Sequence, residues 1–116
     1  MKTIKSSSEI TNIFEHGRRI GVSDFSLIVL RNDNQHDLDG RVAFIAGKKN
    51  GNAVWRNRAK RRMRALCFEA GGAFPGYDVI FLARKTVTEA PFDKMSARLK
   101  AALSKAGIAA DRDGTN

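Results

Sequence analysis

The residues of this sequence with the clearest capacity for chemistry are cations gathered in one window. From Arg41 to Phe68 the chain has nine Lys or Arg residues and no Asp or Glu. The nine are Arg41, Lys48, Lys49, Arg56, Arg58, Lys60, Arg61, Arg62 and Arg64. The whole chain has 21 basic and 12 acidic residues, so the part outside this cationic window, with 12 of each, is neutral. A localised surplus of this kind indicates a polyanionic partner.

The mixture of Arg and Lys in the window suits a folded RNA. The planar guanidinium of Arg can bind a phosphate through two hydrogen bonds, whereas Lys supplies a mobile point charge. Because side chains read the grooves of duplex RNA poorly, contacts with the backbone and its shape are the expected mode. A charge run is usually just a solvated helix face. Here, however, neighbouring like charges on a helix repel by about 0.2 to 0.5 kcal/mol per pair, which favours a partner that neutralises them.

Little in the sequence supports catalysis by the protein itself. His16 and His36 lie in or beside predicted loops, with no Cys or carboxylates placed to complete a metal site or a nucleophilic triad. The acidic residues are too dispersed for a two-metal nuclease centre. Gly47 and Gly51 lack the spacing of a phosphate-binding loop. We therefore expect no catalytic residue, and no metal or cofactor bound by the protein itself.

The first third of the chain reads as a helix followed by extended structure. Ser6 to Ser8 offer N-cap oxygens, apolar residues recur at helical spacing, and Gly17 supplies a stop. From Arg18 to Arg31 the pattern is extended, which predicts one strand buried on much of both faces. A polar surface loop is expected over 32–40, followed by a second strand over 41–46.

A long helix is predicted to present the cations. Asn52 is its candidate N-cap, and it should run to about Glu69 or Ala70. At about 100° per residue, one sector forms the buried stripe, and a core role is favoured over base stacking for its Trp. That stripe consists of Trp55, Ala59, Met63, Leu66 and Ala70. Asn57 and the cations occupy the remaining circumference.

Two further elements complete a single domain over 1–116. A strand is predicted over 77–83 and a last helix from about Pro91 to Ala106, with a frayed polar tail from about 108. The order α-β-β-α-β-α predicts an α/β (α+β) two-layer sandwich, in which a small sheet is covered mainly on one face. Part of the other face could form a groove for an extended nucleic-acid strand. Phe14 could belong either to the core or to that groove.

Composition limits where the protein acts. The chain has 116 residues and 42% hydrophobic content, enough for one modest core. It has no stretch near the roughly 20 apolar residues of a membrane helix and no apolar signal-peptide core, so we expect a cytoplasmic location and no membrane partner. The single Cys67 cannot form an internal disulfide and is expected to be a small apolar core side chain.

The segment 48–64 resembles the signature of the bacterial ribonuclease P protein subunit. Its core reads Gly-Asn-Ala-Val (51–54), then Arg-Asn-Arg (56–58) and Lys-Arg (60–61). The resemblance extends to the first helix ending in Phe-Glu-His-Gly (14–17), to the strand containing Phe25 and to the segment 77–85. It covers nearly everything from Ile4 to Ala106.

This resemblance implies an accessory protein. In the family a large RNA performs the Mg²⁺-dependent hydrolysis that releases the 5′ leader of precursor tRNA, and the protein assists as a monomer bound one to one in the bacterial cytoplasm. The protein alone is expected to be inactive. The family fold includes a left-handed βαβ crossover, which the general preference for right-handed crossovers does not predict.

Site residues carry over onto matching positions. The residues expected to face the catalytic RNA are Lys48, Lys49, Asn52, Arg56, Asn57, Arg58, Lys60, Arg61, Arg62 and Arg64. Those expected to contact the leader are Ile10, Phe14, Ser26 and Ile28. The family often has aromatic residues at the positions of Ile10 and Ile28, so leader contacts here are expected to be weaker, because stacking is worth about 1 to 3 kcal/mol per base.

Two other interpretations are open at this point. The same basic helix would serve a ribosome-associated or general RNA-binding structural protein. A protein-only nuclease is the third, although the dispersed acids disfavour it.

Overall fold

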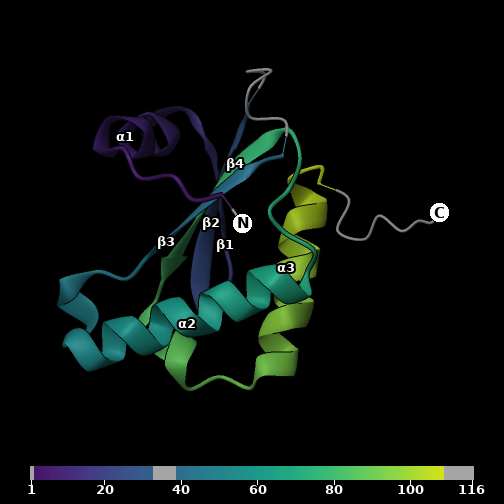
Figure 1. Ribbon diagram of the computed structural model, residues 1–116. Coiled ribbons are helices and arrows are strands. Elements are labelled where there is room, and N and C mark those ends of the chain that lie inside the picture. Colours follow the sequence, from purple (N-terminus) through teal and green to yellow (C-terminus); the bar gives the residue numbers. More distant parts are fainter. Residues whose placement is uncertain (1, 33–38, 109–116) are drawn as a thin grey trace.

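The computed structural model describes residues 2–32 and 39–108 (Figure 1). In chain order, the main elements are α1 (Ser7–His16), β1 (Arg18–Gly21), β2 (Phe25–Arg31), β3 (Arg41–Ile45), α2 (Ala53–Glu69), β4 (Tyr77–Ala83) and α3 (Phe92–Lys105). Two short 3-10 turns, η2 (Lys48–Asn50) and η3 (Lys85–Thr88), precede α2 and α3. The predicted helices and the strands beginning at 41 and 77 are confirmed.

Two expectations fall wholly or partly outside this description. The predicted surface loop includes residues 33–38, and the predicted frayed tail includes residues 109–116; neither stretch is described. Ile108, where the tail was expected to begin, is buried against the core.

The sheet is mixed and has the strand order β1-β2-β4-β3. β2 is antiparallel to both β1 and β4, whereas β3 is parallel to β4. A parallel pair needs a crossover connection, and α2 supplies it between β3 and β4. The predicted mixed α+β fold class is confirmed. The hand of the crossover stays a prediction.

The extended segment 18–31 is a hairpin rather than the single strand that its pattern predicts. Its turn lies between β1 and β2, where the backbone N–H of Val22 donates to the carbonyl of Phe25 at 2.9 Å. Asp24 in this turn is buried and accepts hydrogen bonds from Thr86 and Arg98, both at 2.7 Å. Both donors lie far along the sequence, so local alternation could not reveal the turn.

Helices cover both faces of the sheet, but to different extents. The larger core lies between the sheet and the α2–α3 layer, where the ring centroid of Phe81 lies 6.1 Å from that of Phe25 and 5.2 Å from that of Phe44. A smaller core lies under α1 and consists of Ile4, Ile13, Ile28, Ala43 and Ile80. The expectation of a sheet covered mainly on one face is thus confirmed, and α1 shelters part of the other face (Figure 1).

The ends of α1 and α2 follow their sequence signals. The Asn52 side chain accepts a hydrogen bond from the backbone N–H of Trp55 at 2.9 Å, and such a cap is worth about 1 kcal/mol. Gly17 ends α1 in extended backbone, where a Cβ would lie 2.6 Å from the carbonyl oxygen of Ile13 and 2.8 Å from Cγ2 of Ile28. Close approach of the helix end to β2 therefore requires glycine at this position.

Among residues 2–32 and 39–108, no helix has the length and apolar character needed to cross a membrane.

Candidate nucleic-acid interface

α2 turns a continuous exposed surface away from the core. Its buried side is the predicted stripe of Ala59, Met63, Leu66 and Ala70, joined by Cys67. Trp55 is half-buried against the core and donates its indole N–H to the carbonyl of Lys85 at 3.3 Å, which supports the core role expected for it. We define the outward face of α2 by seven of its exposed side chains, Val54, Asn57, Arg58, Arg61, Arg64, Ala65 and Phe68; the other two exposed residues of the helix, Ala53 and Glu69, lie at its ends.

The predicted RNA-facing residues divide by exposure. Seven of the ten are exposed: Lys48, Lys49, Asn52, Asn57, Arg58, Arg61 and Arg64. Arg56, Lys60 and Arg62 are half-buried on the flanks of α2. The structure therefore brings all ten together along one helix and the turn before it.

Hydrogen bonds within the protein hold two of the flanking cations. Arg62 donates to the backbone carbonyl of Ala90 at 2.8 Å, and Arg56 donates to that of Gly51 at 3.4 Å. The guanidinium of Arg64 lies 5.3 Å from the ring centroid of Phe44, a cation–π contact that fixes its direction while leaving it exposed. None of these contacts neutralises the charge.

From Lys48 to Arg64, no cation forms an ion pair with a residue in the described part of the chain. The first turn of α2 has no acidic residue, so the positive end of the helix dipole adds to the charge of Lys48 and Lys49. Free backbone N–H groups at a helix start and a positive dipole end both favour an anion. The geometry suits repeated phosphate groups along about 25 Å of helix.

Arg41, the first cation of the window, is part of the fold. It donates to both carboxylate oxygens of Asp78, at 3.1 and 2.8 Å, and to Glu9 at 3.0 Å. The hydrogen bond to Asp78 is the main cause that raises the pKa of Arg41, and Glu9 adds to it. Eight uncompensated cations therefore remain of the nine in the window.

The predicted leader-contacting residues do not form one accessible surface. Phe14 is 39% exposed, which excludes a core role, and Ile10 beside it is half-buried. Ser26 and Ile28 are buried, so neither side chain is accessible to a ligand in this structure, and their role as leader contacts stays a prediction. Ile28 lies under α1 within the smaller core, and Ser26 accepts a hydrogen bond from Arg84 at 3.1 Å.

Two half-buried side chains that the sequence analysis missed, Ile45 and Leu82, are accessible on that sheet face. Leu82 is the register partner of both Ser26 and Ile45, so the three form one row across β2, β4 and β3. Leu82 and Ile45 are partly buried, whereas Ser26 is covered. The sequence analysis assigned no face to either residue, and local alternation could not have shown which positions α1 would leave uncovered.

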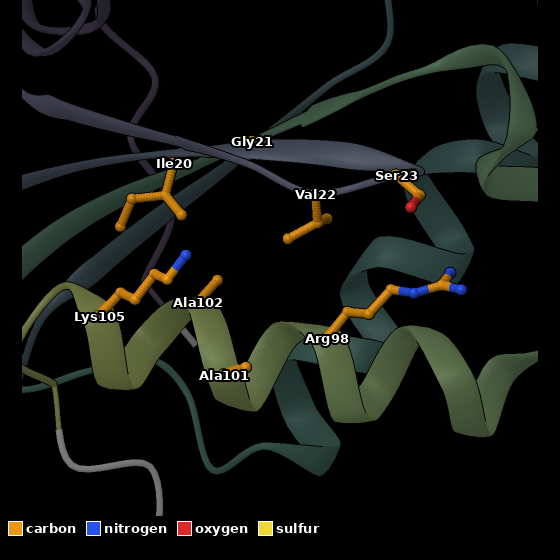
Figure 2. Close-up of a pocket in the computed structure, with 8 residues that line it drawn as sticks. All are labelled: Ile20, Gly21, Val22, Ser23, Arg98, Ala101, Ala102 and Lys105. Atoms are coloured by element: carbon orange, nitrogen blue, oxygen red, sulfur yellow. The ribbon is translucent and has the colours of Figure 1, made fainter.

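A pocket elsewhere in the molecule contains none of the predicted site residues. Figure 2 shows Ile20 and Val22 facing α3, where Ala102 lies. The pocket that they line has a volume of about 260 Å³. Arg98 at its rim forms an ion pair with Asp24 at 2.7 Å. The pocket is lined mainly by small and apolar side chains, and one of its cations is already neutralised, so the interface on α2 is the better candidate.

The histidines and the other potential metal ligands do not form a second candidate site in the described part of the chain. His16 is exposed, and its Nδ1 lies 3.2 Å from the carbonyl oxygen of Asn12, as expected of a surface histidine; His36 lies outside the described residues. Within 2–32 and 39–108, no three His, Cys, Asp or Glu side chains gather as potential metal ligands.

Cys67 is fully buried in the larger core, as predicted. Burial raises the pKa of its thiol from the ordinary 9.0 to about 12. As the pH rises above 9, the unfolded chain ionises this thiol first, so folding stability falls between the two pKa values, and Cys67→Ala should remove that decline.

We expect a disulfide thiol reagent at pH 8 to react at least about 100-fold more slowly with native than with urea-unfolded protein. The reaction rate is measured from the release of the reagent's chromophore. Equal rates for native and unfolded protein would contradict the burial of Cys67.

Comparison with known proteins is consistent across the chain. A family model described as Ribonuclease P matches residues 1–107. The ribonuclease P protein component of Syntrophomonas wolfei is 37% identical over 106 residues, which cover 90% of this chain and 87% of that relative. The RNase P protein of Staphylococcus aureus has a similar fold, with a TM-score of 0.75 and 24% identity over 93% of this chain and 97% of that chain. The RNase P protein of Thermotoga maritima also has a similar fold, with a TM-score of 0.74 and 22% identity over 90% of this chain and 97% of that chain.

Proposed function

The chain belongs to the ribonuclease P protein family, and from this premise we propose that it assists a catalytic RNA in removing the 5′ leader of precursor tRNA. It is a ribonuclease P protein component of the bacterial type, which implies a role in an endoribonuclease complex and an RNA partner. The proposal adds the direct contacts: α2 and η2 bind the catalytic RNA, and the sheet face beside α1 receives the leader. One protein monomer binds one RNA.

The observation that carries the proposal is the outward face of α2. It is exposed along the whole helix and rich in Arg, and Glu69 is the first acidic residue after the window. Each Arg or Lys that neutralises a phosphate releases counterions, so binding should be strong and dependent on salt concentration. Asn57 lies among the cations and can both donate and accept hydrogen bonds with bases or 2′-hydroxyl groups.

The protein's contribution to the reaction is electrostatic in this proposal. Folded RNA brings phosphates together against their mutual repulsion, and fixed guanidinium groups lower that repulsion without divalent ions. A protein-assisted RNA should therefore cleave at a lower Mg²⁺ concentration than the RNA alone.

Mg²⁺, which the family reaction requires, does not fit the outward face of α2. This ion prefers carboxylate, phosphate and water oxygens, whereas the face offers mainly guanidinium groups, with one amide oxygen from Asn57. We therefore assign the Mg²⁺ ions to the RNA, with no step routed through a protein ligand.

The proposed leader surface lies on the sheet face opposite α2. Phe14 supplies an exposed ring for base stacking, while Ile45 and Leu82 supply an apolar floor. Lys48 is three residues after Ile45, so the cationic turn begins where this floor ends. A strand of nucleic acid crossing the floor would thus reach a phosphate-binding group.

Reconstitution tests the proposal. We expect that adding the protein to a bacterial ribonuclease P RNA at low Mg²⁺ restores cleavage of precursor tRNA, measured as release of the 5′ leader on a denaturing gel. The control is the same protein without RNA, which should release nothing. RNA binding without stimulated cleavage would support a general RNA-binding protein instead, and cleavage by the protein alone would support a nuclease.

A further inference from the structure

Two large apolar side chains lie on the outward face of α2. Val54 is 68% exposed and Phe68 is 75% exposed, and among residues 2–32 and 39–108 the only other exposed large apolar residue is Phe14. Single exposed apolar residues are common and need no explanation. The position of Phe68 gives it significance, because it continues a row of RNA-binding cations.

Helical geometry aligns Phe68 with that row. Arg61 and Arg64 precede it by seven and four residues, and at about 100° per residue all three point in nearly the same direction. Along the axis Phe68 is about 6 Å from Arg64 and about 10 Å from Arg61. The ring therefore stands at the carboxyl end of the cationic face.

The core fixes this orientation. Leu66, Cys67 and Ala70 are all buried, so the helix cannot rotate to bury Phe68 without exposing them. In the part of the chain that the structure describes, no other ring or cation contacts the Phe68 ring. Its aromatic face is thus available to a partner.

The one acidic residue beside Phe68 is turned elsewhere. Glu69 accepts a hydrogen bond from Ser96 of α3 at 2.5 Å and lies 3.8 Å from the ammonium group of Lys100. Its carboxylate is therefore directed toward α3 and partly neutralised. An approaching phosphate meets Arg61 and Arg64 rather than this carboxylate.

We propose that Phe68 stacks on an unpaired base of the RNA that α2 binds, while Arg61 and Arg64 hold the adjoining phosphates. This inference rests on the proposed function and names a contact within it. Paired bases in a duplex are already stacked on both sides, so the occupant is a nucleotide in a loop, bulge or junction of the catalytic RNA. Aromatic stacking of this kind is tolerant of base identity.

Charge favours RNA over a second copy of the chain as the occupant. Two outward faces brought together would oppose cations to cations, and the adjacent Glu69 is already bound to Ser96 and close to Lys100 of its own chain. A nucleic acid brings the opposite charge together with exposed aromatic rings, and so satisfies both features of the face.

Three variants of Phe68 test the contact through the dissociation constant for ribonuclease P RNA at several salt concentrations. Phe68→Ala is expected to weaken binding about tenfold, with the slope of affinity against salt unchanged, because a stacked base adds no phosphate contact. Phe68→Tyr should keep the affinity, whereas Phe68→Leu should lose most of what Phe68→Ala loses. Wild-type affinity in Phe68→Ala, or in Phe68→Leu, would overturn the stacking contact.

A spectroscopic readout gives the direct test. In the background Trp55→Phe, the variant Phe68→Trp contains one indole, and we expect its fluorescence to be quenched on adding RNA. Unchanged emission under saturating RNA would overturn the inference, as would self-association of the wild-type chain in sedimentation that Phe68→Ala abolishes. If the wild-type protein stimulates cleavage while Phe68→Ala binds equally well, only this inference fails; if the wild-type protein does not stimulate cleavage, the proposed function fails.

Discussion

Replacing Arg61 and Arg64 together by Ala is expected to weaken binding of ribonuclease P RNA at least about 100-fold, since each hydrogen-bonded charged contact contributes about 1.5 to 3 kcal/mol and tenfold in affinity is about 1.4 kcal/mol. Both side chains lie on the exposed face of α2 and form no ion pair with a described residue. The slope of log affinity against log salt should fall by about 1.5, because two fewer counterions are displaced. Filter binding or fluorescence anisotropy across a salt series measures both quantities.

The matched control removes two cations from another surface. Lys94→Ala with Lys105→Ala on α3 brings the formal charge from +9 to +7, as the α2 double variant does. If net charge alone governed binding, the two double variants would weaken it equally. We expect the α3 variant to keep nearly all of the affinity and the wild-type salt slope.

Stability must be measured alongside, because Arg64 also covers a ring. Its cation–π contact with Phe44 is worth about 0.5 to 1 kcal/mol, so the α2 double variant should unfold slightly earlier in urea. Arg64→Lys keeps the charge while losing the planar fork. If Arg64→Lys binds RNA with an affinity between those of the wild type and Arg64→Ala, the guanidinium of Arg64 binds a phosphate through two hydrogen bonds.

Arg41→Ala is expected to lower the free energy of unfolding by about 3 to 5 kcal/mol, because it leaves a buried carboxylate without its cation. The Asp78 side chain is 6% exposed, and it also accepts a hydrogen bond from Asn32 at 3.0 Å. A loss of this size is a large part of the 5 to 15 kcal/mol of stability typical of a small domain. Urea unfolding followed by circular dichroism measures it.

Two further variants test whether the loss comes from the buried ion pair. Glu9→Gln removes only the exposed partner of Arg41 and should cost about 0 to 1 kcal/mol. The pair Arg41→Met with Asp78→Leu should recover much of the loss, since no unpaired charge remains. A loss below about 1 kcal/mol in Arg41→Ala would show that Arg41 does not stabilise the buried Asp78 carboxylate.

The same variant separates structural from RNA-binding cations within one window of sequence. Under conditions in which Arg41→Ala is folded, its salt slope with RNA should equal that of the wild type. A reduced slope would place Arg41 at the interface, contrary to its contacts with Asp78 and Glu9.

Local periodicity and capping determined much of this protein. The spacing of Ala59, Met63 and Leu66 fixed which side of the helix is buried and hence that Arg58, Arg61 and Arg64 face outward. The helix cap at Asn52 and the helix end at Gly17 could be predicted from the sequence, because they depend on neighbours within a few residues. The acid-free window predicted an anionic partner without reference to the fold.

The tertiary structure alone decided which charges and which sheet residues stay available. Arg41 looks like its eight basic neighbours in sequence, yet it is paired with Asp78 and Glu9, which lie 37 and 32 residues away, and so is not available as the other eight are. Ser26 and Ile28 had the alternation of a strand face, but Arg84 and α1 cover them, and Leu82 and Ile45 take the accessible positions. The turn at Asp24 depends on Thr86 and Arg98 in the same way. A side chain's neighbours in the sequence fix its direction, whereas its exposure and free charge depend on partners that only folding brings into contact.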